Sequence, residues 1–229
     1  MNLIRKGHRH AHRGVIGIES AIVLIAFVIV AAALAFVVLN MGFATTQKAK
    51  TAITSALGEA GSSLQVSGKV VGQSTTGATP LTVLMIPLKI TTGGESIDLN
   101  TTRATISYLS NDVEYNNIYR NGCTIQTQEY SNATAAWAQA ITNTCVTINP
   151  LTAPPLNTTA IIYWAVSQQA VPNTILEQGE HAILSIGWNA THVPDSLDKI
   201  KVELTITGGA TLTVERDIPG ISSRVIDLG

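Results

Sequence analysis

The longest apolar run of the chain lies near its N-terminus. Ala21 to Leu39 is a run of nineteen consecutive apolar residues. As an α-helix it would span about 28 Å, enough to cross the hydrocarbon core of a bilayer. Because apolar residues occupy every side of this segment, it differs from an amphipathic surface helix. The pattern predicts a helix whose surroundings are apolar all round.

The helical pattern continues beyond the apolar run. Small and apolar residues recur at spacings of three and four as far as Ala60. Gly58 and Gly61 then supply a stop signal. We therefore expect one helix over residues 15–61, about 65–70 Å long. A membrane anchor does not need the second half of such a helix, whereas a stalk that packs against copies of itself does.

From residue 62 onward the pattern changes to short strand-like runs between turn signals. The clearest runs are 64–72, 80–91, 102–109, 160–167, 181–188, 199–206 and 210–217. Several short strands without helical patterns between them predict a β-sandwich or barrel. The expected fold class is therefore α+β: a long N-terminal helix followed by an all-β, immunoglobulin-like outer domain over residues 62–229.

The last two of these strands are predicted to form a hairpin with a three-residue loop, residues 208–210. This loop sets Leu204 opposite Val214, which places the apolar residues of both strands on one face of the sheet. It also sets Glu203 opposite Glu215. We interpret this like-charge pair as exposed and solvated, with some loss of stability.

Charge is distributed unevenly along the chain. The net charge is −1, but Arg5, Lys6, Arg9 and Arg13 all precede the apolar run; without residues 1–14, ten basic residues face fifteen acidic ones and the net charge is −5. A body of that sign has no basic patch to neutralise phosphates, which argues against binding to nucleic acid. Under the positive-inside rule the basic flank stays cytoplasmic, so everything after the helix lies outside the cell.

The chain contains two cysteines, Cys123 and Cys145, which lie 22 positions apart without C-x-x-C spacing. This arrangement does not fit a zinc site. Two interpretations remain. The pair is either a disulfide formed outside the cytosol, which would stabilise the fold by about 3 kcal/mol, or two buried free thiols.

Motifs for catalysis are absent from the sequence. It contains no P-loop, H-E-x-x-H or G-x-S-x-G motif, and beyond residue 14 the histidines are His181 and His192. We expect no enzyme activity, no cofactor and no metal site. The oxygens around Asp112 and Glu114 would suit calcium, but their spacing matches no known loop, and we interpret the cluster as a solvated turn.

Four N-x-[ST] sequons lie beyond the predicted helix, at Asn100, Asn132, Asn157 and Asn189. All four would be on the external side of the membrane, where N-glycosylation is chemically feasible. Some such matches arise by chance in a body rich in threonine and asparagine. The sequence therefore gives candidates and does not say which of them carry glycan.

The N-terminal segment itself allows three interpretations. It is a conventional signal peptide that is cut after the small-x-small stretch 33–35, a permanent single-pass anchor, or a segment that is cut before the apolar run and then kept. The first would leave an unusually apolar new N-terminus, and the apolar run is longer than the usual signal core.

Residues 13–19, Arg-Gly-Val-Ile-Gly-Ile-Glu, are followed by unbroken hydrocarbon. This pattern resembles the cleavage site of class III signal peptides, in the type-IV-pilin-like group that includes archaeal flagellins (archaellins). The body adds to the resemblance, because 66–109, 175–189 and 204–219 are similar to the archaellin outer-domain blocks. The segment 112–160 matches nothing in that pattern.

The resemblance implies that a prepilin-type signal peptidase cuts between Gly14 and Val15 and that the helix stays with the mature protein. Gly17 is a further archaellin feature. In pilins the acid that matches Glu19 contacts the new N-terminal amine of a neighbouring subunit; the alternative role of Glu19 is favourable placement in the first helical turn. Filament-core contacts are implied for Gly17, Glu19, Phe27 and Phe36.

The function implied by the resemblance is a structural subunit of the archaellum, the rotating swimming filament. The subunit would be inserted in the membrane first and then assembled by an ATPase and a platform protein into an extracellular helical homopolymer, alone or with other archaellins. Two alternatives remain at this point: an adhesive archaeal type IV pilin, and a membrane-anchored extracellular binding module.

Overall fold

The structure, a computed structural model, describes residues 13–61, 64–75, 80–209 and 211–229. The chain divides into two compact units, Met1–Thr54 and Ser55–Gly229. Helix α1, Arg13–Gly61, makes up the described part of the first unit as far as Thr54, and its last residues from Ser55 onward belong to the second unit. The predicted long helix and its end at Gly61 are therefore present.

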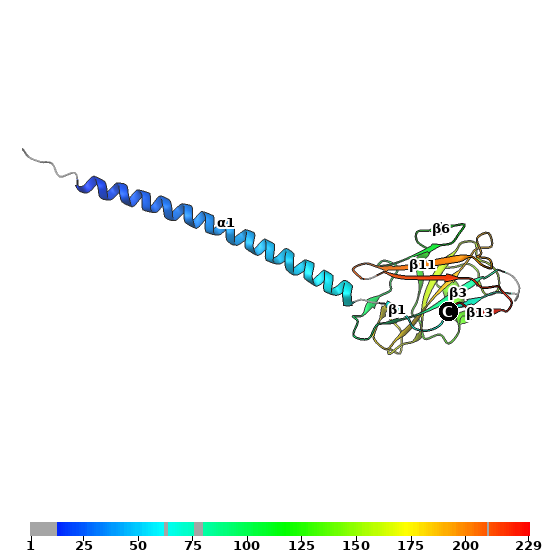
Figure 1. The fold of residues 1–229 in the computed structure, drawn as a ribbon. Helices are drawn as coiled ribbons and strands as arrows, with labels where there is room; N and C mark the ends of the chain where they lie inside the picture. Colours follow the sequence, from blue (N-terminus) through cyan, green and yellow to red (C-terminus); the bar gives the residue numbers. More distant parts are fainter. Residues whose placement is uncertain (1–12, 62–63, 76–79, 210) are drawn as a thin grey trace, which may run out of the picture. The chain divides into compact units, whose positions relative to one another are not determined.

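The second unit, the outer domain, is built on β-sheets (Figure 1). Within the described residues the larger sheet has seven strands. Six of them follow one another across the sheet in the order β13 (Val225–Asp227), β2 (Val71–Gln73), β3 (Val83–Ile90), β10 (His181–Gly187), β8 (Thr159–Val166) and β7 (Tyr119–Ile125). The seventh strand, β1 (Leu64–Val66), also pairs with β3.

A smaller sheet of four strands faces the larger one across the core, again counted over the described residues. Its order is β12 (Leu212–Asp217), β11 (Lys199–Ile206), β5 (Ala104–Leu109) and β6 (Glu114–Tyr115). A short third pair joins β4 (Ile97–Asp98) to β9 (Ile175–Leu176). Every run that the sequence predicted as a strand overlaps at least one of these strands.

Alternating residues of each sheet meet in one hydrophobic core. On β10, Ala182, Leu184 and Ile186 are almost fully buried. Aromatic rings connect the two sheets, since Tyr108 of β5 and Trp188 after β10 have ring centroids 5.6 Å apart in an edge-on arrangement. The two-layer β architecture and the α+β fold class that the pattern predicted are confirmed.

One element of the outer domain was not predicted. Helix α2, Ala133–Thr142, connects β7 to β8, and these two strands pair in parallel. Parallel neighbours need a crossover of this kind, because a tight hairpin cannot join them. The outer domain is thus rich in β-structure but not all-β, and α2 lies within 112–160, the segment without a match in the family pattern.

The register of the last hairpin differs from the prediction by two residues. Leu204 lies opposite Leu212, and Glu203 lies opposite Thr213. The expected partners Val214 and Glu215 lie opposite Val202 and Lys201 instead. A shift of two residues keeps the same side chains on the core face, and it replaces a like-charge pair with an opposite-charge pair. The last pair of the hairpin is Leu204 with Leu212, so the connection between the paired residues is longer than the predicted three-residue loop.

Candidate functional site

Helix α1 exposes apolar side chains on all its sides. Phe27 and Phe36, both predicted as filament-core contacts, are 75% and 68% exposed. No part of the described residues covers the segment Gly17–Thr54, which is the one described helix long and apolar enough to cross a membrane. At 1.5 Å per residue these 38 residues extend about 57 Å. That length is nearly twice the hydrocarbon thickness of a bilayer.

Polar side chains in the second half of α1 bond to the helix itself. The hydroxyls of Thr45, Thr46, Thr51 and Thr54 donate to the carbonyl oxygen four residues earlier, at distances of 2.5 to 2.9 Å. A hydroxyl that is satisfied in this way does not need water. These threonines can therefore pack against apolar neighbours without leaving a buried hydroxyl donor unpaired.

The predicted cleavage position lies within the helical backbone. Helix α1 runs without a break through Gly14 and Val15, whose side chains, like residues 1–12, lie outside the described set. Gly17 and Glu19 are exposed, and a Cβ added at Gly17 would meet nothing within 4 Å. Glu19 has no ion-pair partner among the described side chains. The structure does not test the cleavage or the role of Glu19.

The two cysteines form a disulfide. Cys123 on β7 is bonded to Cys145, just after α2, with their Cα atoms 5.1 Å apart. This bond excludes the interpretation as free thiols. The backbone is crowded here, because a Cβ on Gly122 would lie 2.7 Å from the carbonyl oxygen of Asn143. The positive φ of 83° at Gly122 and of 61° at Thr144 fits this close approach.

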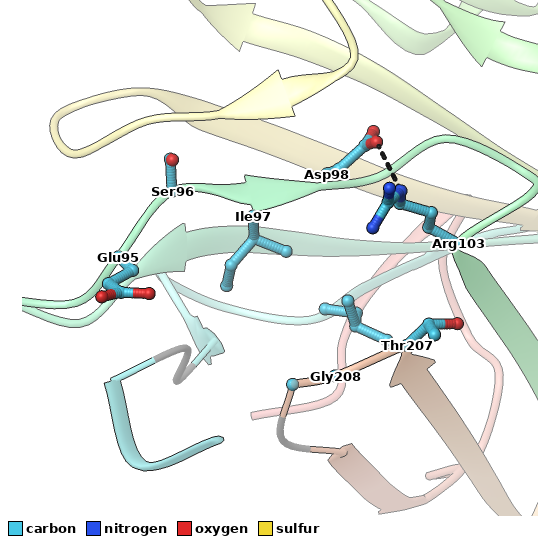
Figure 2. Close-up of a pocket in the computed structure, with 9 residues that line it drawn as sticks. Glu95, Ser96, Ile97, Asp98, Arg103, Thr207 and Gly208 are labelled. Carbon is cyan, nitrogen blue, oxygen red and sulfur yellow. Dashed lines mark ion pairs between the residues drawn. The ribbon is translucent and has the colours of Figure 1, made fainter. Parts of the chain in front are cut away.

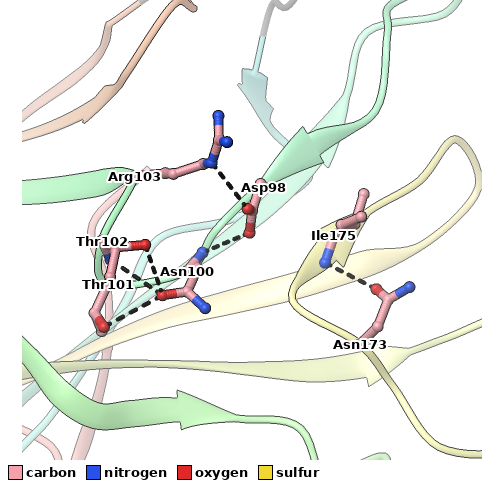
Figure 3. Close-up of polar contacts among 7 residues, drawn as sticks. All are labelled: Asp98, Asn100, Thr101, Thr102, Arg103, Asn173 and Ile175. Carbon is pink, nitrogen blue, oxygen red and sulfur yellow. Dashed lines mark hydrogen bonds and ion pairs between the residues drawn. The ribbon is translucent and has the colours of Figure 1, made fainter.

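The sequon at Asn100 lies in a tight polar turn after β4 (Figure 3). Its Oδ1 accepts the backbone N–H of Thr102 at 3.1 Å and the Thr102 hydroxyl at 3.2 Å. Asp98 precedes it and pairs with Arg103 at 3.5 Å. These bonds hold the amide oxygen, while Nδ2, the atom that a glycan would use, has no hydrogen-bond partner among the described residues.

The other three sequons lie on different parts of the outer domain. Asn132 is exposed and caps helix α2, since its Oδ1 accepts the N–H of Ala135 at 2.8 Å. Asn157 is also exposed. Asn189 is half-buried, and its Oδ1 accepts the N–H of His192 at 3.0 Å. The structure therefore places all four asparagines at the surface without testing whether any is modified.

A small hollow lies beside the turn between β11 and β12 (Figure 2). Its volume is roughly 190 Å³, and its lining includes Glu95, Asp98, Arg103 and Thr207. The only charge pair drawn there is Asp98 with Arg103. The hollow contains no histidine or cysteine, and no group of three or more metal-ligating side chains occurs in the described part of the chain. Asp112 and Glu114 are both exposed.

One carboxylate is buried in the outer domain. Glu180 is 2% exposed. Its oxygens accept the backbone N–H of Gln168 at 2.9 Å, that of Glu177 at 3.0 Å, and the hydroxyl of Ser167 at 2.8 Å. Burial alone would raise the pKa of Glu180, but these hydrogen bonds outweigh it and lower the pKa below its usual value. The carboxylate thus fastens two neighbouring turns together.

Comparison with known protein families gives a match over most of the chain. The model of the archaeal-type flagellin family matches residues 14–216. The chain is 37% identical over 210 residues to probable flagellin 1 of Aeropyrum pernix, which is 90% of this chain and 92% of that protein. It is 34% identical over 122 residues to flagellin FlaB2 of Saccharolobus shibatae, 52% of this chain and 40% of that protein.

Solved structures share the fold. The archaeal flagellum of Methanospirillum hungatei strain JF1 aligns with a TM-score of 0.60 at 24% identity, over 92% of this chain and 98% of that one. The crystal structure of archaeal flagellin FlaB1 from Methanocaldococcus jannaschii aligns with a TM-score of 0.57 at 15% identity, over 73% and 96%. At these identities the likeness concerns the arrangement of helix and sheets.

Proposed function

Because this chain belongs to the archaeal-type flagellin family, it is a structural subunit of the archaeal flagellum filament, and we propose that it polymerises through helix α1 after residues 1–14 are removed. It associates with copies of itself in a filament on the cell surface, and it is not an enzyme. Neither the adhesive pilin nor the membrane-anchored binding module is favoured.

The exposed apolar surface of α1 is the observation that supports this proposal. Thirteen of the nineteen residues from Ala21 to Leu39 are Ile, Val, Leu or Phe. Removing them from water is worth about 1.5–3 kcal/mol each, or about 20–40 kcal/mol together. Nothing in the described chain supplies that burial, so a bilayer or a bundle of α1 helices has to. A subunit that left the bundle would return this surface to water, which makes the filament very stable.

The need for assembly partners follows from the same hydrophobic free energy. The hydrophobic gain is similar in lipid and in a dry bundle of helices, so transfer of α1 from the membrane to the filament is close to neutral. Extraction therefore needs an external source of free energy. We assign this role to a membrane assembly ATPase acting through a platform protein, on a membrane-inserted precursor, and the processing step to a prepilin-type signal peptidase. Another archaellin with the same apolar helix surface would be able to enter the same filament.

Processing is tested at the proposed cleavage position. Filaments sheared from cells should contain this chain with Val15 as its first residue, determined by N-terminal sequencing. The variant Gly14→Val should accumulate in membranes with residues 1–14 attached and should form no filaments. Gly42→Ala is a matched control, since a Cβ there meets nothing within 4 Å. An intact Met1 in purified filaments would contradict the proposal.

Glu19 has a separate test. We assign its carboxylate to the new amine of Val15 in a neighbouring subunit, because a charge this close to an apolar helix is costly unless paired. Glu19→Gln should then be cleaved and inserted normally but should assemble poorly. If it assembles like the wild type, Glu19 acts only in its own first helical turn.

Glycosylation is tested without disturbing the fold. Asn132 also caps α2, so its sequon is best removed by Thr134→Ala, which leaves the cap in place. For Asn100, Thr102→Ala removes the sequon and Thr102→Ser keeps it. Mass spectrometry of filament peptides should show glycan lost only where the sequon is lost. Peptides of unmodified mass at all four sites would refute this assignment.

Filament function is tested by deletion of the gene. Loss of swimming with surface attachment retained is the result expected of an archaeal flagellum subunit. Loss of attachment with swimming retained would instead identify an adhesive filament.

A further inference from the structure

Leu197 combines two unfavourable features. It lies in the turn before β11 with a φ of 74°, and its side chain is 84% exposed. At positive φ the Cβ of an L-residue lies too close to the backbone, which glycine avoids and asparagine tolerates. Because the side chain is exposed, no free energy of burial offsets this backbone strain. Within one copy of the chain, leucine is thus a poor choice at this position.

The backbone holds Leu197 firmly in this conformation. Its N–H donates to the carbonyl oxygen of Ile218 at 2.8 Å, and the N–H of Ile218 donates to the carbonyl of Asp198 at 2.9 Å. The Asp198 carboxylate accepts the N–H of Asp195 at 2.8 Å and the side-chain amide of Asn111 at 3.1 Å. Strained residues persist where the surroundings determine them in this way, and they concentrate at functional positions.

The residues around the Leu197 side chain indicate what kind of partner surface it would fit. Asp195, Ser196 and Pro219 near it are exposed, and Ile221, whose N–H donates to the Ser196 hydroxyl at 3.3 Å, is half-buried. A projecting leucine with an acidic rim is complementary to an apolar socket that carries a basic side chain. A few well-packed side chains at the centre of a contact carry most of its binding free energy.

We infer that the Leu197 turn is a contact point between the outer domains of neighbouring copies of this chain. The inference rests on the proposed function, since a polymerising subunit meets its own copies first. The outer domain supplies the complementary chemistry: Arg120 makes no ion pair among the described residues and lines a hollow with Pro155 and Leu156. Arg120 lies on β7 of the larger sheet and Leu197 next to the smaller one. A contact between two different surfaces does not close, and so it propagates as a helix.

The decisive variant is Leu197→Asn, because asparagine relieves the strained backbone and removes the apolar side chain. The folding of the outer domain is followed in the detergent-solubilised full chain through Trp137, Trp164 and Trp188, all of which are buried there. The unfolding midpoint should equal or exceed that of the wild type. The filament mass recovered per cell should fall about tenfold, as for loss of an interface anchor.

Two control variants separate this role from other effects. Leu197→Met keeps both the strain and the apolar surface, and it should assemble like the wild type. Val171→Asn removes an apolar side chain that is 62% exposed and has no positive φ, and it should also assemble normally. Wild-type yield of Leu197→Asn filaments would overturn the inference, and so would a fall in its unfolding midpoint parallel to the loss of filaments. Absence of the wild-type chain from the filaments would instead refute the proposed function.

Discussion

The disulfide between Cys123 and Cys145 allows a quantitative prediction. The bond closes a loop with a sequence separation of 22 residues. In the chain-entropy model, a loop of this length restricts the unfolded chain enough to stabilise the fold by about 3 kcal/mol. For a domain of this size each kcal/mol corresponds to about 2–4 °C, so reduction should lower the unfolding midpoint of the outer domain by about 6–12 °C.

Tryptophan fluorescence is a suitable assay for this change. Trp137 lies on α2, inside the closed loop, whereas Trp164 and Trp188 lie on or next to strands outside it, and all three are buried. Thermal unfolding of the full chain in detergent is compared with and without reductant. The double variant Cys123→Ala/Cys145→Ala should unfold like the reduced wild type and should not respond to reductant.

Two results would refute this reasoning. If the wild type unfolds at the same temperature in both conditions, the bond does not restrict the unfolded chain. If the double variant still responds to reductant, the effect of reductant does not arise from this disulfide. A shift confined to a first transition would indicate that α2 and β7 unfold separately from the sheets.

Three further predictions concern the outer domain. Because the pKa of Glu180 is lowered on folding, its contribution to stability is present at neutral pH and is lost as the pH falls below about 4.5 through the folded pKa. The variant Glu180→Gln should therefore be less stable than the wild type at pH 7 by about 1–3 kcal/mol. Unfolding measured as a function of pH should show that the variant lacks this acid dependence. Gly187→Ala should destabilise by about 1–3 kcal/mol, because the new Cβ would lie 2.7 Å from Pro150, whereas Gly220→Ala, in open space, should unfold like the wild type in urea. Thr144→Asn should raise the unfolding free energy by about 1 kcal/mol by relieving a positive φ; an unchanged value would show that Thr144 is not strained.

The elements that the sequence predicted well are those with long, regular patterns. Nineteen consecutive apolar residues and the heptad-like spacing after them leave no alternative to a helix of the length of α1. The strands β3, β10 and β11 have seven or eight residues each, and their alternation is repeated often enough to be read locally. The N-terminal motif around Gly14 and the outer-domain blocks also carried the family resemblance correctly.

Helix α2 was missed although a signal for it exists. Ala133, Ala136, Trp137 and Ala140 are buried at helical spacing, and Asn132 supplies an N-cap. Three of these four core residues are alanine, which contributes little to a hydrophobic pattern. The parallel pairing of β7 with β8 is also not visible locally, because it depends on a crossover of 33 residues between the end of β7 and the start of β8.

The sequence did not predict the hairpin register or the strained residues, for a different reason. Both registers of the last hairpin put Leu204 on the core face, so alternation alone does not distinguish them. The strand β5 pairs with the other side of β11, and this long-range contact is not part of the hairpin's own pattern. The positive φ of Leu197 is likewise imposed by bonds to Ile218, 21 positions away in the chain. No local pattern encodes such a contact.

The two units of the chain place their apolar side chains by opposite rules, and this separates folding from assembly. In the outer domain these side chains are buried between sheets, so the fold is complete within one copy. In α1 they stay exposed while the threonine hydroxyls bond to the helix itself, so the helix lacks only partners. Substitutions in the outer domain should therefore change unfolding first, and substitutions in α1 should change assembly first. Leu197 discriminates between these rules, because it lies in the outer domain but is exposed like a residue of α1.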